Sequence, residues 1–258
     1  VYFVDKAFNR IKRLEISKQK VSIVSGENGL GNLPSSTISA PVSLALGRFN
    51  GPWGLAIHPN ADTLYVADEG NRLLKSLTIK GNLANQLVRW RVGLLAGGIN
   101  PPSRAKNSNI RLHNIAVDSG YVNISDYAFN YNISNYNFAT DSVKIVSKKT
   151  LGDFADGFSY MQRKPDGVSP NIGDWTYFTD SENFALRRVN RKSGYMETVA
   201  GNPPPNPIDG TSNGLPLTEA KFSDPGPIAF NIRGYIDILD RTGASGKSAV
   251  RRYYIPRW

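Results

Sequence analysis

One short pattern occurs several times along this 258-residue chain. It reads LYVADEGNRLLKSL at residues 64–77, VYFVDKAFNRIKRL at 1–14 and TYFTDSENFALRRV at 176–189. Each copy has a strand-like apolar segment, an Asp, a polar turn that contains Asn, and a second strand-like segment with bases beside apolar residues. An internal repeat of this kind restricts the fold to architectures that stack equivalent units.

An Asp at the end of the first segment sets the period of the repeat. Aligned on it, the chain shows five copies with spacings of 63, 58, 54 and 60 residues, at Asp5, Asp68, Asp126, Asp180 and Asp240. A carboxylate at a strand end can accept hydrogen bonds from the backbone amides of the following turn. We therefore expect this set of Asp residues, called the Asp column below, to be architectural.

Two further strands are predicted for each unit. Small apolar inner strands precede the Asp at 53–59, 113–119 and 226–232, with a weaker copy at 154–162 that is followed by an insertion at 163–175. Outer strands follow the hairpin at 21–26, 92–98, 143–147 and 196–201. Each unit thus contains four short strands joined by turns, and no segment has the periodicity of an amphipathic helix.

Repeated four-stranded units of this length are typical of a β-propeller, whose sheets pack face to face around a central channel. One sheet alone cannot cover its two apolar faces, which explains why the hairpin recurs. The sequence therefore predicts an all-β fold, a β-propeller with five recognisable four-stranded units, in a single domain over residues 1–258.

The repeats resemble a known family. The run RFNGPWGLAIHPNADTLYVADEGNRLLKSL at 48–77 is similar to an NHL repeat, and so are the segments at 177–202 and 209–230, which contain YFTDSENFALRRV and DPGPIAF. The third unit departs from the family pattern, because VNISDYAFNYNISNYN replaces the basic strand. The resemblance implies a propeller, commonly of six blades. It also implies the functions of such propellers, which are protein binding, RNA binding through a basic face, extracellular modules and, more rarely, enzymes such as the peptide-amidating lyase.

The ends of the chain bear on whether the ring is complete. The chain starts at Val1 with the second strand of a unit and stops at Trp258 after the third strand of another. We therefore expect a processed chain or a fragment, incomplete at one or both ends and six-bladed if it is a fragment. Closing the ring would take about 60 further residues by the repeat period, or a strand donated by a partner or by a second copy.

The sequence offers no catalytic constellation. The chain has no Cys and only two His residues, His58 and His113. The amidating lyase of the resembling family holds zinc with several His residues, and a catalytic zinc site generally needs three protein ligands. The two His residues could lie near one rim with a carboxylate, but a capping or packing role is the simpler interpretation. We predict no enzyme activity, no metal site and no cofactor, and we interpret the glycine-rich or acidic segments at 26–33, 165–167 and 208–214 as loops or turns.

Two kinds of binding fit the remaining residues. In the first, loops on one face hold a protein partner or mediate self-assembly, with Trp53, Trp90 and Trp175 as candidate anchors. In the second, a basic face holds RNA or another polyanion; its candidate residues are Arg10, Arg13, Arg72, Lys75, Arg187, Arg188, Arg251 and Arg252. The alternative for these bases is that their stems pack between sheets while the charged ends reach solvent. We favour the protein partner.

The charge and composition of the chain limit its possible partners and location. The formal net charge is +10, and no acid follows Asp240. Such a surface keeps a protein soluble or docks on something acidic. Two N-x-S/T sequons, at Asn123 and Asn132, are glycosylation candidates and favour an extracellular location. No apolar run approaches the roughly 18 residues that would span a membrane, so we expect no membrane insertion.

Overall fold

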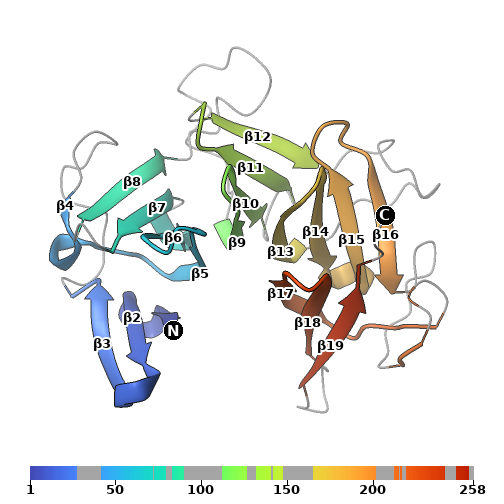
Figure 1. Ribbon diagram of the computed structural model, residues 1–258, viewed down its shortest axis with the longest axis horizontal. Helices are drawn as coiled ribbons and strands as arrows, with labels where there is room; N and C mark the ends of the chain where they lie inside the picture. The colour runs from blue at the N-terminus through green and yellow to red at the C-terminus, as the bar shows by residue number, and fades with distance from the viewer. Residues whose placement is uncertain are drawn as a thin grey trace. The chain divides into compact units, whose positions relative to one another are not determined.

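The computed structural model describes residues 1–27, 42–71, 73–79, 83–89, 112–126, 132–140, 142–147, 165–201, 212–214, 216, 219–241 and 248–255. These residues form short antiparallel strands and single 3-10 turns, with no α-helix among them (Figure 1). The chain divides into two compact units, Val1–Ser119 and Gly120–Trp258. That the whole of 1–258 is one domain stays a prediction.

Unit one contains two sheets and one further strand. The first sheet has the order β1-β2-β3, and the second has the order β4-β8-β7-β6-β5. The strands are β1 (Tyr2–Asp5), β2 (Arg10–Glu15), β3 (Lys20–Ser25), β4 (Val42–Ser43), β5 (Pro52–Ile57), β6 (Thr63–Asp68), β7 (Leu73–Thr78), β8 (Leu83–Arg89) and β9 (Leu112–Val117). The 3-10 turns are η1 (Lys6–Phe8), η2 (Ile16–Lys18), η3 (Leu44–Leu46) and η4 (Glu69–Asn71).

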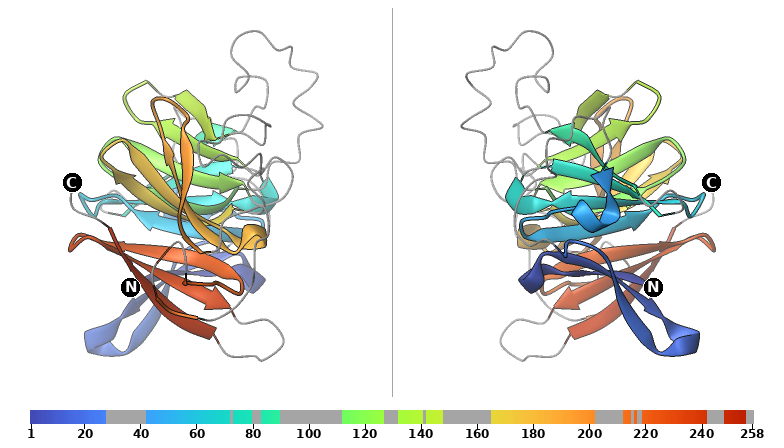
Figure 2. Two further views of the ribbon diagram at one scale, coloured as in Figure 1. Left: turned by 90° about the vertical axis from the view of Figure 1, so that its right-hand side faces the viewer. Right: turned by 90° about the vertical axis from the view of Figure 1, so that its left-hand side faces the viewer.

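Unit two continues the same pattern. The strands are β10 (Tyr121–Asp126), β11 (Ile133–Asn137), β12 (Ser142–Ser147), β13 (Pro165–Ile172), β14 (Trp175–Asp180), β15 (Ala185–Asn190), β16 (Met196–Gly201), β17 (Pro225–Asn231), β18 (Tyr235–Arg241) and β19 (Ser248–Tyr254), with the 3-10 turn η7 (Ser181–Asn183). The third sheet along the chain pairs β12, β11 and β10 in that order, the fourth has the order β13-β14-β15-β16, and the last has β17-β18-β19. The strands of each sheet twist relative to one another, as Figure 2 shows.

The Asp column marks the same register in each of the three sheets where the inner strand can be compared. Asp68, Asp180 and Asp240 each lie opposite a Pro that begins the inner strand, namely Pro52, Pro165 and Pro225. Proline has no backbone N–H to donate to a ladder, which suits the first position of a strand. The hairpin that recurs in the sequence is therefore a recurring structural unit, and the prediction of an all-β repeat is confirmed.

The inner strand of the fourth sheet was wrongly predicted. It is β13, within the segment interpreted as an insertion, while 154–162 lies outside the described residues. The Asp-Gly pair in this strand resembles a turn, but Gly167 is needed for close packing: an added Cβ would lie 2.6 Å from Ile228 N and 2.7 Å from Gly226 O. The strand beside β7 is β8, earlier in the chain than the predicted segment 92–98, which also lies outside the described residues.

Each sheet has two faces with different partners. We call one the leading face. It carries the residue directly before the column Asp, together with the residue that pairs with that position on the following strand. In the first sheet these two residues are Val4 and Ile11. The opposite, trailing face carries the column Asp and the residue two positions before it. In unit one, the leading face of the first sheet packs on the trailing face of the second, where Ile11 meets Leu64 and Val66.

The same contact recurs in unit two. Tyr177 and Leu186, on the leading face of the fourth sheet, pack on Ile236 and Ile238, on the trailing face of the last sheet. Burial of these apolar side chains between neighbouring sheets forms the core, which is why one sheet needs the next. The core is thus a series of equivalent inter-sheet layers.

Candidate functional site

The two ends of each sheet differ in their connections. At one end, called the Asp end, the second strand finishes at the column Asp and the inner strand begins. The connections β3 to β5, β8 to β9, β12 to β13 and β16 to β17 all enter inner strands at this end, and they are long. The inner-to-second hairpin turns at the other end, such as 58–62 and 232–234, are short. Because loops on a rigid scaffold carry most binding residues, the Asp end is the expected place for a site.

Column Asp residues organise this end. Asp68 is buried, and its carboxylate accepts hydrogen bonds from Asn50 N at 2.8 Å and from Asn71 Nδ2 at 2.7 Å. Lys75 Nζ lies 2.5 Å from Asp68 Oδ2, and both side chains are shielded from solvent. Asp68 therefore joins the incoming connection, the 3-10 turn and the third strand, an architectural role as expected. Its backbone partner lies before the inner strand and not in the following turn.

Burial and charge have opposite effects on the pKa values of Asp68 and Lys75. Burial raises the pKa of Asp68 and lowers the pKa of Lys75, because a low-dielectric surrounding disfavours each charged form. The ion pair and the hydrogen bonds to Asp68 favour the charged forms. A buried pair of this kind is costly to break, since removing one partner leaves the other charge buried and unpaired.

Most of the candidate bases for a polyanion are held by acids. Arg187 Nη1 donates to Asp180 Oδ2 at 3.1 Å, and both side chains are buried. Lys75 and Arg187 therefore lie in the core, and their assignment to a basic surface is wrong: the repeat uses them to neutralise the column. The other pairs are Arg13 with Glu15, Arg188 with Glu197, Arg251 with Asp240 and Arg252 with Asp237.

Two candidate bases remain. Arg10 is half-buried beside Phe8, with its guanidinium carbon 5.8 Å from the ring centroid. Arg72 lies outside the described residues. Lys75, Arg187 and Arg251 thus recur because the column Asp residues with which they pair recur.

An aromatic group stands at the Asp end of unit one. Trp53, the second residue of β5, is 39% exposed, and its ring is stacked on that of His113 with centroids 4.3 Å apart. Lys6 Nζ lies 3.7 Å from the Trp53 ring centroid and 3.2 Å from Glu69 Oε2. We call Trp53, His113, Lys6 and Glu69 the tryptophan cluster. It presents a large aromatic side chain that is exposed and yet held in place.

Close backbone packing brings the cluster together. A Cβ on Gly54 would lie 2.6 Å from His113 O and 2.9 Å from Ile115 N, so only glycine lets β5 approach β9 this closely. Gly51, with a φ of 58°, donates its N–H to Asn9 Oδ1 at 2.6 Å. This bond ties the first turn of the chain to the start of β5, which places Lys6 over the indole.

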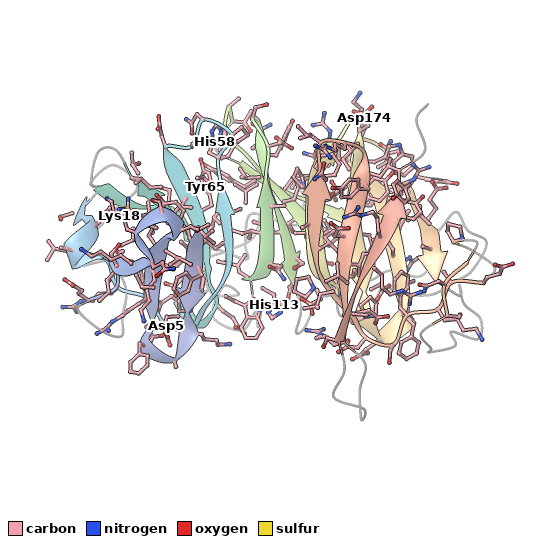
Figure 3. All side chains as sticks on the ribbon, turned by 60° about the horizontal axis from the view of Figure 1, so that its bottom comes forward. Asp5, Lys18, His58, Tyr65, His113 and Asp174 are labelled. Atoms are coloured by element: carbon pink, nitrogen blue, oxygen red, sulfur yellow. The ribbon has the colours of Figure 1, made fainter. Side chains whose placement is uncertain are left out.

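The two His residues do not share a site. Figure 3 shows His113 at the same end of unit one as Asp5, and His58 at the opposite end, where its ring lies beside that of Tyr65. The alternative in which both line one rim does not hold, because His58 follows its inner strand whereas His113 stands at the start of the next one. Among the described residues, no group of three His, Cys, Asp or Glu side chains could hold a metal ion.

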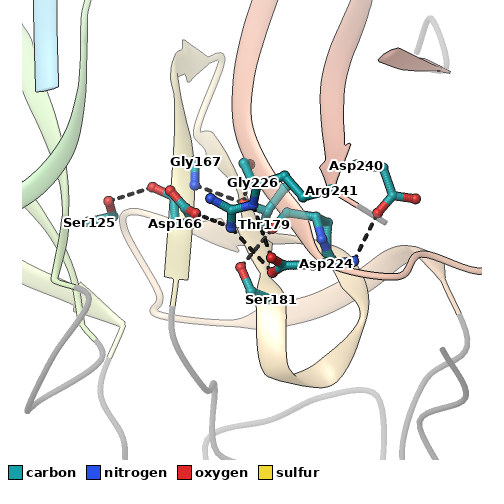
Figure 4. Close-up of polar contacts among 10 residues, drawn as sticks. Ser125, Asp166, Gly167, Thr179, Ser181, Asp224, Gly226, Asp240 and Arg241 are labelled. Atoms are coloured by element: carbon teal, nitrogen blue, oxygen red, sulfur yellow. Dashed lines mark hydrogen bonds and ion pairs between the residues drawn. The ribbon is translucent and has the colours of Figure 1, made fainter. Parts of the chain in front are cut away.

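Unit two has an ionic group at its Asp end (Figure 4). Arg241 Nη2 donates to Asp166 Oδ2 at 2.6 Å, and Arg241 Nε lies 3.0 Å from Asp224 Oδ2. The Asp166 side chain is fully buried. Burial alone would lower the pKa of Arg241, but attraction to Asp166 and Asp224 outweighs it and raises this pKa above its ordinary value.

Hydroxyl groups reinforce this end of unit two. Ser125 Oγ donates to Asp166 O, Thr179 Oγ1 to Gly226 O, and Ser181 Oγ to Pro225 O, each at 2.7 Å. Each bond runs from one sheet to the inner strand of the next, so the inner strands are pinned at this end.

Comparisons with known proteins identify the architecture. No family model matches the sequence, and no curated protein matches it. Three solved structures are similar to it: a nidogen/laminin complex (TM-score 0.56, 13% identity), an auxiliary nutrient binding protein from Bacteroides ovatus (0.54, 17%) and a catalytically inactive virginiamycin B lyase from Staphylococcus aureus with quinupristin (0.52, 13%). With its repeated antiparallel sheets, the chain has the fold of these proteins. It is a β-propeller.

The coverage of these alignments is uneven. They include 99%, 92% and 98% of this chain but 75%, 62% and 66% of the three others, in the same order. At such identities the likeness shows the fold alone.

Another candidate anchor of the propeller lies at the other end of its sheet. Trp175 begins β14 and so stands away from Asp180. The Arg188 guanidinium carbon is 4.2 Å from the Trp175 ring centroid, and Tyr195 makes an edge contact with a centroid distance of 6.1 Å. Trp53 and Trp175 therefore occupy opposite ends of their respective sheets. Trp90 lies outside the described residues.

The sequons lie in strands or beside them. Asn123 is fully buried in β10, where its Nδ2 donates to Ser169 O at 2.7 Å, so the folded sheet has no room for a glycan and this candidate is wrong. Asn132 is 9% exposed, which leaves little space at the second candidate.

The described part of the propeller contains no helix with the length and apolar character needed to cross a membrane.

Proposed function

We propose that this propeller is a non-catalytic interaction module that binds a protein partner through the loops at the Asp end, with the tryptophan cluster as the anchor. The observation that carries the proposal is the state of Trp53, which is 39% exposed and yet fixed by the His113 ring and the Lys6 ammonium. Binding energy at protein interfaces is concentrated in such aromatic side chains, usually surrounded by less important contacts.

Fixing the indole before binding favours affinity. Ordering a mobile side chain at an interface costs about 0.5–1.5 kcal/mol. The stack with His113 and the cation–π contact with Lys6 limit the rotamers of Trp53 in the free protein. A partner that covers the exposed edge of the ring would gain apolar contact with a smaller loss of conformational entropy. Each sheet supplies a rigid support for the loops beside this anchor.

The separation of the two His residues supports a non-catalytic role. His58 and His113 lie at opposite ends of unit one, so they cannot share a metal ion or a proton-transfer path. The column Asp residues, which could otherwise serve as acids or bases, hold Lys75 and Arg187 in buried ion pairs. Of the similar solved structures, one is a complex between two proteins, and another is named as a nutrient binding protein.

RNA or another polyanion is the second candidate ligand. The net charge of +10 and the acid-free end of the chain favour it. Against it, Arg188, Arg251 and Arg252 each pair with a carboxylate, which reduces the charge that they offer to phosphate. Affinity for a generic RNA would fall steeply with salt if phosphates were neutralised. We therefore rank this candidate below a protein partner.

We also propose that the units are repeats of the NHL type. The Pro-x-Gly phrase that opens the inner strand at 52–54 recurs at 165–167, opposite a column Asp in both sheets. In that family, this phrase and the following Asp hairpin occur in the same order.

Affinity capture from the native source would test the proposed function. The Trp53→Ala variant should lose a partner that wild-type protein retains at a defined ratio, as measured by quantitative mass spectrometry. Trp175→Ala is the matched control, because it removes an indole at the other end of a sheet, and it should retain the partner. Equal retention by both variants, or co-purification of RNA without any protein, would exclude the tryptophan cluster as a protein anchor.

A further inference from the structure

Two Asn-Gly pairs lie within the described residues, and their backbones are held differently. They are Asn50–Gly51, directly before β5, and Asn213–Gly214, in the connection between β16 and β17. A third pair, at 28–29, lies outside the described residues. Both described Asn side chains are exposed. Any difference in their reactivity therefore comes from hydrogen bonds and not from access of water.

The backbone nitrogen of a Gly that follows Asn can attack the Asn side chain. Glycine has no Cβ, so its nitrogen approaches the Asn Cγ without steric obstruction. A bond forms between the Gly nitrogen and Cγ, the bond from Cγ to Nδ2 breaks, and ammonia leaves with the proton that the Gly nitrogen gives up. Water then opens the cyclic imide at one of its carbonyl carbons and leaves Asp or isoaspartate. The net change is the replacement of NH by O, and the product carries a new carboxylate.

Hydrogen bonds hold the first pair in an unreactive state. Gly51 N donates to Asn9 Oδ1 at 2.6 Å. Asn50 O accepts a bond from Gly70 N, and Asn50 N donates to Asp68 Oδ1, each at 2.8 Å. These bonds fix the peptide groups on both sides of Asn50 and engage the proton that attack would have to release.

The second pair has a guanidinium on the carbonyl that would be attacked. Arg251 Nη2 donates to Asn213 Oδ1 at 2.9 Å. Within the part of the chain that the structure describes, the Gly214 N–H makes no hydrogen bond, and the Gly214 φ of 146° is one that glycine adopts readily. A charged donor in this place draws electrons away from Cγ. It also stabilises the oxyanion that forms on Oδ1 during attack, as the donors of an oxyanion hole do.

The Asp column holds this guanidinium in place. Arg251 Nη1 donates to Asp240 Oδ2 at 3.1 Å and also to Lys221 O, while Nη2 donates to Ser212 O as well as to Asn213. The donor is therefore oriented before the reaction begins, which is the condition under which such a group stabilises developing charge most effectively.

We propose that Asn213 is a site of spontaneous deamidation that Arg251 activates. The product places a carboxylate beside the guanidinium, so Arg251 is shared between Asp240 and the new acid. Isoaspartate also lengthens the backbone by one methylene group, in the connection that enters β17 at the Asp end. The modification lowers the formal net charge of +10 by a single charge. It does not depend on the function proposed for the tryptophan cluster.

Peptide mapping by mass spectrometry, after the folded protein has been aged at mildly alkaline pH, would test the proposal. Asn213 should convert faster than Asn50 in the wild-type chain. Arg251→Lys should slow the conversion of Asn213 about ten-fold, the factor expected from the loss of one charge-assisted hydrogen bond, and leave Asn50 unchanged. Lysine suits this position because Lys75 pairs with Asp68 at the equivalent place in the second sheet. The column ion pair is thus kept, while the fork that reaches the Asn side chain is lost.

Two controls separate the effect of the structure from that of the sequence. Asn213→Gln, whose side chain closes a larger ring only slowly, should show no conversion at this position. In urea-unfolded wild-type protein, Asn213 and Asn50 should convert at similar rates, because each precedes Gly. Circular dichroism checks that Arg251→Lys is folded. Equal rates at the two positions in the folded wild-type chain, or an unchanged Asn213 rate in folded Arg251→Lys, would overturn the proposal.

Discussion

Arg187 reaches Asp180 across 3.1 Å with both side chains buried between two sheets of the propeller. The same relation joins Lys75 to Asp68, and more exposed versions join Lys12 to Asp5 and Arg251 to Asp240. In each of these sheets, a base on the third strand neutralises the Asp that ends the second strand. This pairing accounts for much of the periodic charge in the sequence.

Removing Arg187 should destabilise the protein strongly. Arg187→Ala would leave the Asp180 carboxylate buried without its cation, which typically costs about 3–5 kcal/mol. The free energy of unfolding from urea titration measures the loss. Lys12→Ala, in the more exposed pair with Asp5, is the control and should cost much less. Equal losses in the two variants would mean that burial of the ion pair does not determine how much it stabilises the fold.

The glycines of the inner strands should also tolerate substitution poorly. Gly167→Ala places a methyl group 2.6 Å from the backbone N of Ile228, so the sheets must separate. We expect a loss of about 1–3 kcal/mol in the free energy of unfolding, as for other overpacked cores. Gly173→Asn is the control: nothing lies within 4 Å of its Cβ position, and Asn tolerates the φ of 62°. A neutral Gly167→Ala variant would contradict the close approach of β13 to β17.

The phenols of two tyrosines should lose their protons at an unusually high pH. Burial raises the pKa of Tyr65 and of Tyr253 to about 12, above the ordinary value of about 10. The folded protein thus favours the neutral phenol, so this contribution to stability is present below about pH 10 and is lost as the pH rises through 12. Ultraviolet titration should show a late phase that shrinks in Tyr65→Phe and in Tyr253→Phe. Full titration of both phenols near pH 10 in folded protein would contradict their burial.

RNA should bind weakly, if at all, when the bases are architectural. Arg188, Arg251 and Arg252 are already paired with carboxylates, so they would neutralise few phosphates and release few counterions from RNA. Affinity for an RNA oligonucleotide measured between 50 and 200 mM salt checks this, and we expect weak or undetectable binding at both. Tight binding that falls by a factor of roughly 10³ over this range would favour the polyanion.

The repeat made most of the fold predictable, whereas the site depended on contacts between distant segments. The Asp column and its hairpins follow from local patterns, because strand, turn and strand are adjacent in the chain. The strand at 165–172 was missed since an Asp-Gly pair usually signals a turn, although the Pro-x-Gly phrase it shares with 52–54 could have revealed it. Here the packing of Gly167 on the next inner strand overrides the turn preference of Asp-Gly.

The roles of the charged and aromatic residues were harder to predict. A sequence shows that bases recur, but not that Lys75 and Arg187 point at the column Asp residues inside the core. Trp53 was identifiable as a candidate anchor. Its partners His113 and Lys6 come from other segments of the chain, and only the packing of β5 on β9 and on the first sheet brings them together.

Crosslinking from position 53 tests the central claim most directly. A photoreactive phenylalanine analogue would replace Trp53 in one protein and Trp175 in another, and each would be irradiated in an extract of the native source. The account predicts one protein adduct of defined mass from position 53 and none from position 175. Adducts to RNA, adducts from position 175 alone, or none from position 53 in a folded protein would contradict it.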